Sequence, residues 1–185
     1  YPTMKVKDVI RFAADMRGRD CSEEAGRLCE KLQVDTTKKI QELSLGNRKK
    51  VSIVCAMQHQ PKLLVLDEPT SGLDPLMQDT FFQLLQEANQ KGTTCFLSSH
   101  VLSEVKKYCR NAAIIKEGKI LKVDAVDNLT RTNLRMVKLW RDGMEEHFTH
   151  DGPISALIQK LSTMEPEDVL IEEPSLDEIF MQYYE

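Results

Sequence analysis

Six residues about a third of the way along the chain carry its most informative pattern: Leu64-Val65-Leu66-Asp67-Glu68-Pro69. The aliphatic run begins at Leu63 and does not alternate with polar residues, which predicts a strand buried on both faces of a parallel sheet. Two adjacent carboxylates, Asp67 and Glu68, end the run. Because α/β folds bind ligands at the carboxyl edge of their sheets, both side chains are expected at a ligand site.

The two carboxylates are suited to different tasks. Successive residues of an extended strand point to opposite faces, so Asp67 and Glu68 cannot do the same job. One can face a hydrated Mg²⁺, which prefers carboxylate and phosphate oxygens. The other can face a water and act as a general base. A solvated turn would explain this dipeptide equally well by itself, so the assignment depends on the surrounding motifs.

Helices and strands alternate on both sides of this stretch. Apolar spacing predicts helices, among others, over residues 4–17, 22–32 with Ser22 as N-cap, 46–60, 81–92 and 101–109. A second buried strand is expected at 93–97 and a third strand at 112–116, and the chain then turns at Gly118 into 119–123. This alternation predicts an α/β sheet with right-handed crossovers.

The pattern changes beyond about residue 124. Two segments, 134–140 and 144–149, flank Asp142-Gly143, which predicts a hairpin. The remaining expected elements are a helix over 154–161, a strand over 169–171 and a helix that includes Leu176 and Tyr183 and opens with a Ser175/Glu178 capping box. Together they predict a small α+β unit without evident chemistry.

Composition narrows the class of protein. The chain has 185 residues, with 25 Lys and Arg against 29 Asp and Glu, giving a net charge of −4. An acidic balance argues against a nucleic-acid binder, which needs cations to displace counterions. Five cysteines without a CxxC pair favour a reduced compartment over disulfides or zinc. The sequence starts at Tyr1 without an initiator Met and has no long apolar run, so we expect a piece of a longer protein that does not span a membrane.

Three further motifs surround the carboxylate pair in a fixed order: Leu43-Ser44-Leu45-Gly46-Asn47, Ser71-Gly72-Leu73-Asp74 and Ser98-Ser99-His100. With the Asp67-Glu68 strand, they resemble the signature motif, Walker B strand, D-loop and switch histidine of the nucleotide-binding subunits of ABC transporters. The resemblance covers roughly residues 1–123. It implies an α/β fold, a partial P-loop NTPase parallel sheet with a helical subdomain, followed by a small C-terminal α+β domain.

The resemblance extends to the C-terminal stretch from Glu173 to Phe180, which is similar to the end of ATPase subunits from drug and peptide-antibiotic exporters. It implies three parts: a helical subdomain with the signature motif over 1–60, a Walker B, D-loop and switch-histidine part of the ATPase core over 61–123, and an accessory α+β domain over 124–185.

The family roles transfer residue by residue. Asp67 would hold Mg²⁺ through water, Glu68 would polarise the attacking water, and His100 would contact the γ-phosphate. The family's usual LSGGQ stands here as Leu43, Ser44, Leu45, Gly46 and Asn47. These signature residues would reach a partner's ATP from a helix start, where free N–H groups and the helix dipole favour an anion. Asp74 would connect the two sites across the dimer.

The implied cofactors are ATP and Mg²⁺, and the implied partners are a transmembrane permease and a second nucleotide-binding subunit, most simply a homodimer. The location would be cytoplasmic, at the inner face of the cell membrane. No GxxxxGK[ST] phosphate loop is present in the 185 residues. We therefore expect this chain alone to bind ATP poorly and to hydrolyse it negligibly. In the family fold, the strand of the missing loop lies between the strand that leads to His100 and the strand at 112–116. Its absence would therefore leave apolar strand edges that favour dimerisation or exchange of elements.

Two other interpretations stay open. A non-transport ABC ATPase of DNA repair, chromosome maintenance or translation shares these motifs, although the long heptad helices, basic face or second cassette of such proteins are missing. A truncated ABC protein that acts as an interaction or regulatory module without catalysis fits every motif. The run Arg48-Lys49-Lys50 is interpreted as a solvated face.

Overall fold

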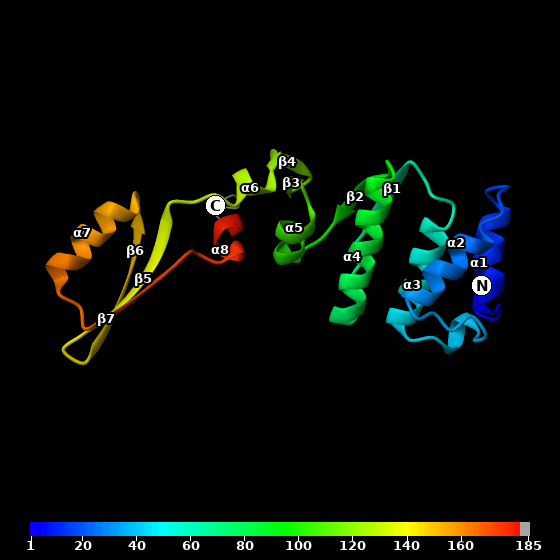
Figure 1. Cartoon of the computed structure of the whole chain (residues 1–185), viewed down its shortest axis with the longest axis horizontal. Coiled ribbons are helices and arrows are strands. Elements are labelled where there is room, and N and C mark those ends of the chain that lie inside the picture. Colours follow the sequence, from blue (N-terminus) through cyan, green and yellow to red (C-terminus); the bar gives the residue numbers. More distant parts are fainter. Residues whose placement is uncertain (182–185) are drawn as a thin grey trace. The chain divides into compact units, whose positions relative to one another are not determined.

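The computed structural model describes residues 1–181 and divides the chain into two compact units, Tyr1–His100 and the part that begins at Val101 (Figure 1). Tyr183, expected in the last helix, lies outside the described residues. The first unit contains α1 (Val6–Asp15), α2 (Ser22–Lys31), the 3₁₀ turn η1 (Ile40–Glu42), α3 (Leu45–Met57), β1 (Leu63–Asp67), α4 (Pro75–Gln90) and β2 (Thr94–Ser98). No helix in the described part of the chain is long and apolar enough to cross a membrane.

Helices α1, α2 and α3 pack around aliphatic side chains spaced three or four residues apart. Val6, Leu28 and Val54, one from each helix, are fully buried. The amide of the buried Gln58 donates to the carbonyl of Ile10 at 3.0 Å and so joins the end of α3 to α1. The expected N-cap of α2 is wrong: Cys21 occupies the cap position without a capping bond. The carboxylate of Asp20 accepts from the Ser22 amide instead, at 2.9 Å.

Strands β1 and β2 form a parallel pair, in register from Leu63 opposite Thr94 to Asp67 opposite Ser98. One face of the pair is covered: Leu64 is buried and lines a cavity of about 150 Å³ together with Leu84 of α4. The other face is open in this unit, with Leu63, Val65 and Phe96 exposed by 57%, 69% and 63%. The expectation of strands buried on both faces is therefore wrong, because helix α4 provides a covering layer on one side alone.

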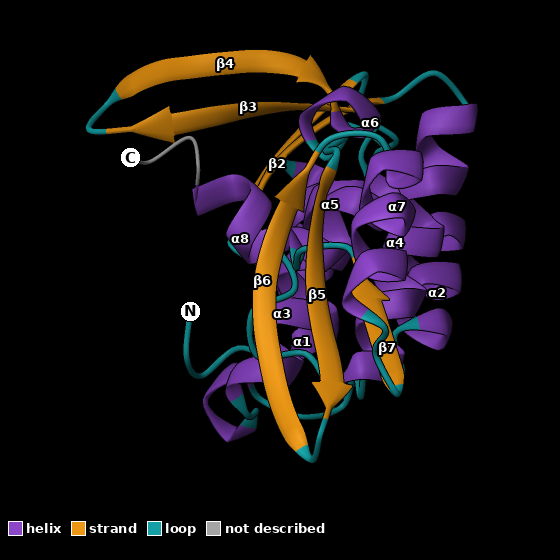
Figure 2. Ribbon diagram, turned by 90° about the vertical axis from the view of Figure 1, so that its left-hand side faces the viewer, coloured by secondary structure: helices purple, strands orange, loops and turns teal. Residues whose placement is uncertain are grey.

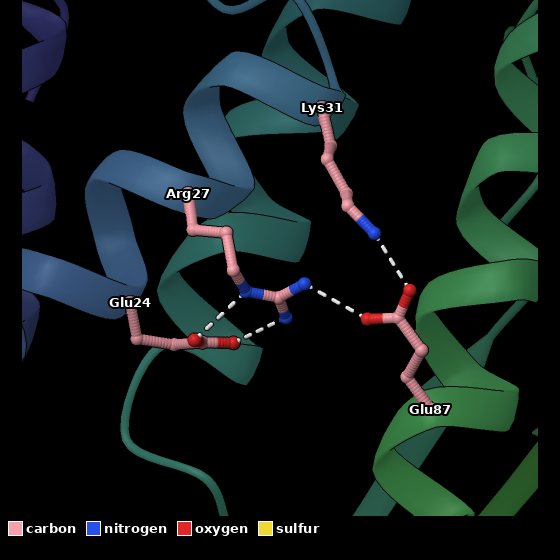
Figure 3. Close-up of polar contacts among 4 residues, drawn as sticks. All are labelled: Glu24, Arg27, Lys31 and Glu87. Carbon is pink, nitrogen blue, oxygen red and sulfur yellow. Dashed lines mark hydrogen bonds and ion pairs between the residues drawn. The ribbon is translucent and has the colours of Figure 1, made fainter.

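An ion-pair network joins the helical part of this unit to α4 (Figure 3). The Arg27 guanidinium donates to Glu24 on its own helix at 2.6 Å and to Glu87 of α4 at 2.8 Å. Lys31 donates to the second oxygen of Glu87 at 2.6 Å. The hydrogen bond from Lys31, followed by that from Arg27, lowers the pKa of the Glu87 carboxyl. The hydrogen bond from Arg27 likewise lowers the pKa of Glu24.

The second unit begins with α5 (Leu102–Tyr108) and the antiparallel hairpin β3 (Asn111–Lys116) and β4 (Lys119–Ala125), followed by α6 (Val126–Leu129). A third strand of a parallel sheet was expected at 112–116, and that expectation is wrong. Glu117 and Gly118 both have positive φ, 51° and 74°, which matches a tight two-residue turn. This turn folds the segment back onto itself, so β3 pairs with β4 in a separate sheet.

The remaining chain forms an antiparallel sheet in the order β6-β5-β7, covered on one face by α7 (Ile154–Met164). Strands β5 (Leu134–Arg141) and β6 (Met144–Asp151) run side by side in Figure 2 and confirm the predicted hairpin. The fully buried Val137, Leu139 and Leu157 form its core. After β7 (Asp168–Glu172), α8 (Leu176–Met181) begins at the predicted capping box, in which Ser175 and Glu178 exchange hydrogen bonds.

Candidate functional site

The carboxyl edge of the β1–β2 pair brings together residues from two separate motifs. Asp67 and Ser98 end their strands in register, directly opposite each other. The Ser98 hydroxyl donates to Oδ1 of Asp67 at 2.5 Å and accepts from the backbone N–H of Glu68 at 3.0 Å. The edge predicted from the sequence is therefore a hydrogen-bonded cluster.

Glu68 is held at three points. Its amide donates to Ser98, its carbonyl accepts from the Ser71 amide at 3.3 Å, and its carboxylate lies 2.8 Å from Nδ1 of His100. Its φ of 43° lies in the left-handed region, where a residue other than glycine costs of order 1–3 kcal/mol and persists where its surroundings fix it. The His100 side chain is 77% exposed and that of Glu68 36%, so the cluster is open to a ligand from solvent.

The signature-like motif forms the start of α3. Ser44 is the N-cap, and its hydroxyl accepts from the Asn47 amide at 3.3 Å. The remaining amides of the first turn have no partner in the helix ladder, and together with the helix dipole they favour an anion. Leu45, at the first helical position, is 67% exposed. Ser44 and Asn47 thus shape the end of a helix that is suited to bind a phosphate.

Gly46 lies against the loop that follows β1. A Cβ added at Gly46 would meet the carbonyl oxygen of Gly72 at 2.5 Å, a distance at which the backbone must shift. Gly72 itself has φ of +81° and packs near the Leu45 side chain. Gly46 of the signature motif and Gly72 of the D-loop motif therefore lie in close contact within one chain, although they are 26 positions apart in the sequence.

Asp74 has a structural task in addition to its predicted one. It is the N-cap of α4, and its Oδ1 accepts from the Met77 amide at 3.0 Å. Pro75 follows at the first helical position, where its missing N–H costs nothing. The predicted role of Asp74 across a dimer stays a prediction.

The basic run after the signature is not uniformly solvated. Arg48 is exposed, whereas Lys50 is buried, with 8% of its surface accessible. Lys50 and Val51 both face the interior because they begin the buried face of α3, which continues to Met57. The interpretation of all three cations as a solvated face is thus wrong for Lys50.

The residues present fit one end of a magnesium nucleotide. No group of three or more metal-ligating side chains occurs in residues 1–181. A single strand-end carboxylate such as Asp67 nevertheless suits Mg²⁺, which keeps several waters and binds proteins through one or two carboxylates together with phosphates. The α3 start suits a terminal phosphate. A Gly-rich loop for the remaining phosphates is absent from the 185-residue sequence.

Ser98 is the residue of this cluster that sequence reasoning missed. The motif Ser98-Ser99-His100 predicts a role for His100 alone. Pairing two parallel five-residue strands from their first residues places Ser98 beside Asp67. That register is the signal that identifies it.

Known proteins with similar sequences include several ATP-binding proteins. Residues 35–105 match the family model described as "AAA domain, putative AbiEii toxin, Type IV TA system". The chain is 36% identical over 124 residues to the uncharacterized ABC transporter ATP-binding protein YhaQ of Bacillus subtilis, covering 64% of this chain and 42% of YhaQ. It is 36% identical over 129 residues to the bacitracin transport ATP-binding protein BcrA of Bacillus licheniformis, covering 65% and 42%.

Two solved structures share its fold. One is an ATP-binding subunit of an ABC transporter, with a TM-score of 0.70 at 22% identity over all of this chain and 64% of that one. The other is the dimeric MJ0796, a bacterial ABC transporter cassette, with a TM-score of 0.61 at 18% identity over 68% and 58%. These matches bear out the predicted α/β fold of the P-loop NTPase type. The chain spans less than half the length of YhaQ and BcrA.

Proposed function

We propose that this chain provides the Walker B, switch and signature parts of an ATPase that powers export. The premise is its homology, over about two thirds of its length, to the ATP-binding proteins of ABC transporters. The observation that carries the proposal is the cluster at the carboxyl edge of β1 and β2. There, Asp67 and Glu68 are adjacent and Glu68 is hydrogen-bonded to His100. A residue that positions the attacking water and a carboxylate that holds the hydrated Mg²⁺ are two of the parts that phosphoryl transfer to water uses.

Each residue has a task that follows from its position. The Glu68 carboxylate can accept a hydrogen bond from a water and orient it. His100 holds that carboxylate in place and would contact the γ-phosphate from the open edge. Asp67 can hold the hydration shell of Mg²⁺, which, when bound, neutralises charge on the β- and γ-phosphate oxygens. The α3 start, with Ser44, Leu45, Gly46 and Asn47, would bind the terminal phosphate of an ATP held by a second subunit.

The proposed partners are a second nucleotide-binding subunit and a membrane permease. The signature residues and Glu68 belong to one unit but perform complementary tasks, so a dimer with two shared sites would use both. Similarity to the bacitracin transport ATP-binding protein BcrA supports a drug or peptide substrate. The proposed location is the cytoplasmic face of the membrane, beside the permease.

The purified 185-residue chain alone is expected to hydrolyse Mg-ATP negligibly, because Glu68 then has no cradled phosphate beside it. Turnover by the isolated chain that disappears in Glu68→Gln would contradict this expectation.

The proposed function is tested in the complex that an affinity tag on this chain isolates from its host. We expect Glu68→Gln to lower the Mg-ATP turnover of that complex at least about a hundredfold, because a positioned general base contributes about 10²–10⁴. Lys138→Gln in the second unit is the matched control, and its turnover should equal that of the wild type. Equal turnover in Glu68→Gln and wild type would refute the ATPase assignment.

A further inference from the structure

Ser98 contacts both members of the carboxylate pair. Its hydroxyl donates to Oδ1 of Asp67 at 2.5 Å and accepts from the backbone N–H of Glu68 at 3.0 Å. A serine hydroxyl has one proton to donate and two lone pairs to accept with, so one hydroxyl can make both bonds. It therefore ties the orientation of one carboxylate to the backbone of the next residue.

The backbone of Glu68 has an uncommon conformation, which needs hydrogen bonds from its neighbours to hold it. With φ at 43°, Glu68 leaves the extended path of β1, and its carboxylate meets His100 instead of following the alternation of the strand. An uncommon backbone conformation persists where neighbouring groups fix it. The Ser98 hydroxyl fixes the amide side of Glu68, and the Ser71 amide fixes its carbonyl side at 3.3 Å.

We propose that Ser98 is a positioning residue of the carboxylate pair, and that its hydroxyl sets the angle between the magnesium-facing Asp67 and the water-facing Glu68. This inference rests on the proposed ATPase function and adds a residue to it. The substitution Ser98→Thr would keep the hydroxyl, whereas Ser98→Ala would remove both bonds. The hydroxyl, and not the size of the side chain, is thus the property that matters.

The test compares the variants Ser98→Ala and Ser98→Thr in the complex isolated through this chain. Because a displacement of about 1 Å can cost about 10² in rate, we expect Ser98→Ala to lower kcat for Mg-ATP at least about tenfold. KM should stay within about threefold of the wild type. Ser98→Thr should restore kcat to within about threefold. Thr94→Val, which removes an exposed hydroxyl from the start of the same strand, should behave like the wild type.

The outcomes separate this inference from the proposed function. Loss of turnover in Glu68→Gln together with normal kcat in Ser98→Ala overturns the role of Ser98 and leaves the ATPase assignment standing. A Ser98→Thr variant as slow as Ser98→Ala also overturns it, because the hydroxyl is then not the cause. Normal turnover in Glu68→Gln overturns both.

A second measurement on the 185-residue chain does not depend on turnover. Amide hydrogen exchange, followed by NMR, should be at least about tenfold faster at Glu68 in Ser98→Ala than in the wild type, and normal in Ser98→Thr. The Thr93 amide, which donates to the Ala88 carbonyl at 3.0 Å, reports whether the fold is intact. Unchanged exchange at Glu68 in Ser98→Ala would contradict the proposal.

Discussion

Gly46 and Gly26 differ in the room that their surroundings leave for a side chain. Gly46 has no room for a Cβ, because the carbonyl oxygen of Gly72 would lie 2.5 Å away. Gly26, in the interior of α2, has nothing within 4 Å of the same position. The first glycine is required by packing between two motifs, and the second merely leaves the helix backbone freer than an alanine would.

Alanine substitutions at these two positions should therefore have opposite effects. We expect Gly46→Ala to lower the free energy of unfolding by about 1–3 kcal/mol, because the loop after β1 must move to make room. Gly26→Ala should raise the free energy of unfolding by about 0.4–1 kcal/mol, because alanine lowers the conformational entropy of the unfolded chain. Urea denaturation of the two variants measures both. If the two shifts had the same sign, the close contact between Gly46 and Gly72 would not govern the stability of this loop.

At the residue scale, much of the candidate site could be predicted from the sequence. Asp67 and Glu68 are predicted at the carboxyl edge of a parallel sheet, whereas His100 is assigned to the same site by the family resemblance. The structure brings the three residues together. Ser98 and the contact of Gly46 with Gly72 were not foreseen. Both depend on the register of paired segments, which periodicity along one segment does not encode.

At the scale of elements, the existence and type of the longer helices and strands followed from local patterns, while their burial did not. Asp142 and Gly143, with φ of 51° and 72°, give the hairpin that their residue types predict. The aliphatic run of β1 predicts a strand with two covered faces, yet Val65 is exposed. A hydrophobic run shows that both faces of a strand can be buried. Whether a face is buried depends on whether another segment of the chain packs against it.

The network between α2 and α4 makes a prediction about pH. Because bonds from Lys31 and Arg27 lower the pKa of Glu87, its stabilising effect is complete above the ordinary value of 4.5 and is lost as the pH falls through the lowered value. We expect Glu87→Gln to lower the free energy of unfolding by about 0.5 kcal/mol at pH 7, a small value because solvent screens the pair. The difference between variant and wild type should shrink as the pH falls below 4.5 and disappear at a pH well below the lowered pKa.

Chemical denaturation at several pH values, with Glu30→Gln as control, checks this prediction. Glu30 is an exposed carboxylate on the same helix as Arg27 and Lys31 that lies outside the network. A Glu87→Gln effect that persisted at low pH, or an equal effect of Glu30→Gln, would mean that the ion pairs do not stabilise the contact between α2 and α4.

At the scale of the whole molecule, the open face of the β1–β2 pair predicts self-association. Burying Val65 and Phe96 between two copies would remove apolar surface from water at about 25 cal/mol per Å². We expect the light-scattering mass of the chain to rise with concentration toward that of a dimer. Phe96→Lys should keep it at the monomer value, whereas Met16→Lys, at a residue 73% exposed just after α1, should not. A monomeric mass at all concentrations would contradict this expectation.

The central claim is that Glu68 serves an ATPase site, and the most direct measurement follows the bound nucleotide itself. The complex isolated through this chain is given Mg²⁺ and ATP labelled on the γ-phosphate, and the intact ATP that stays bound is counted over time. We predict that the wild-type complex releases the label as phosphate, while the Glu68→Gln complex retains intact ATP, since the variant still binds nucleotide but no longer orients the attacking water. Release of labelled phosphate by the Glu68→Gln complex at the wild-type rate would contradict the account.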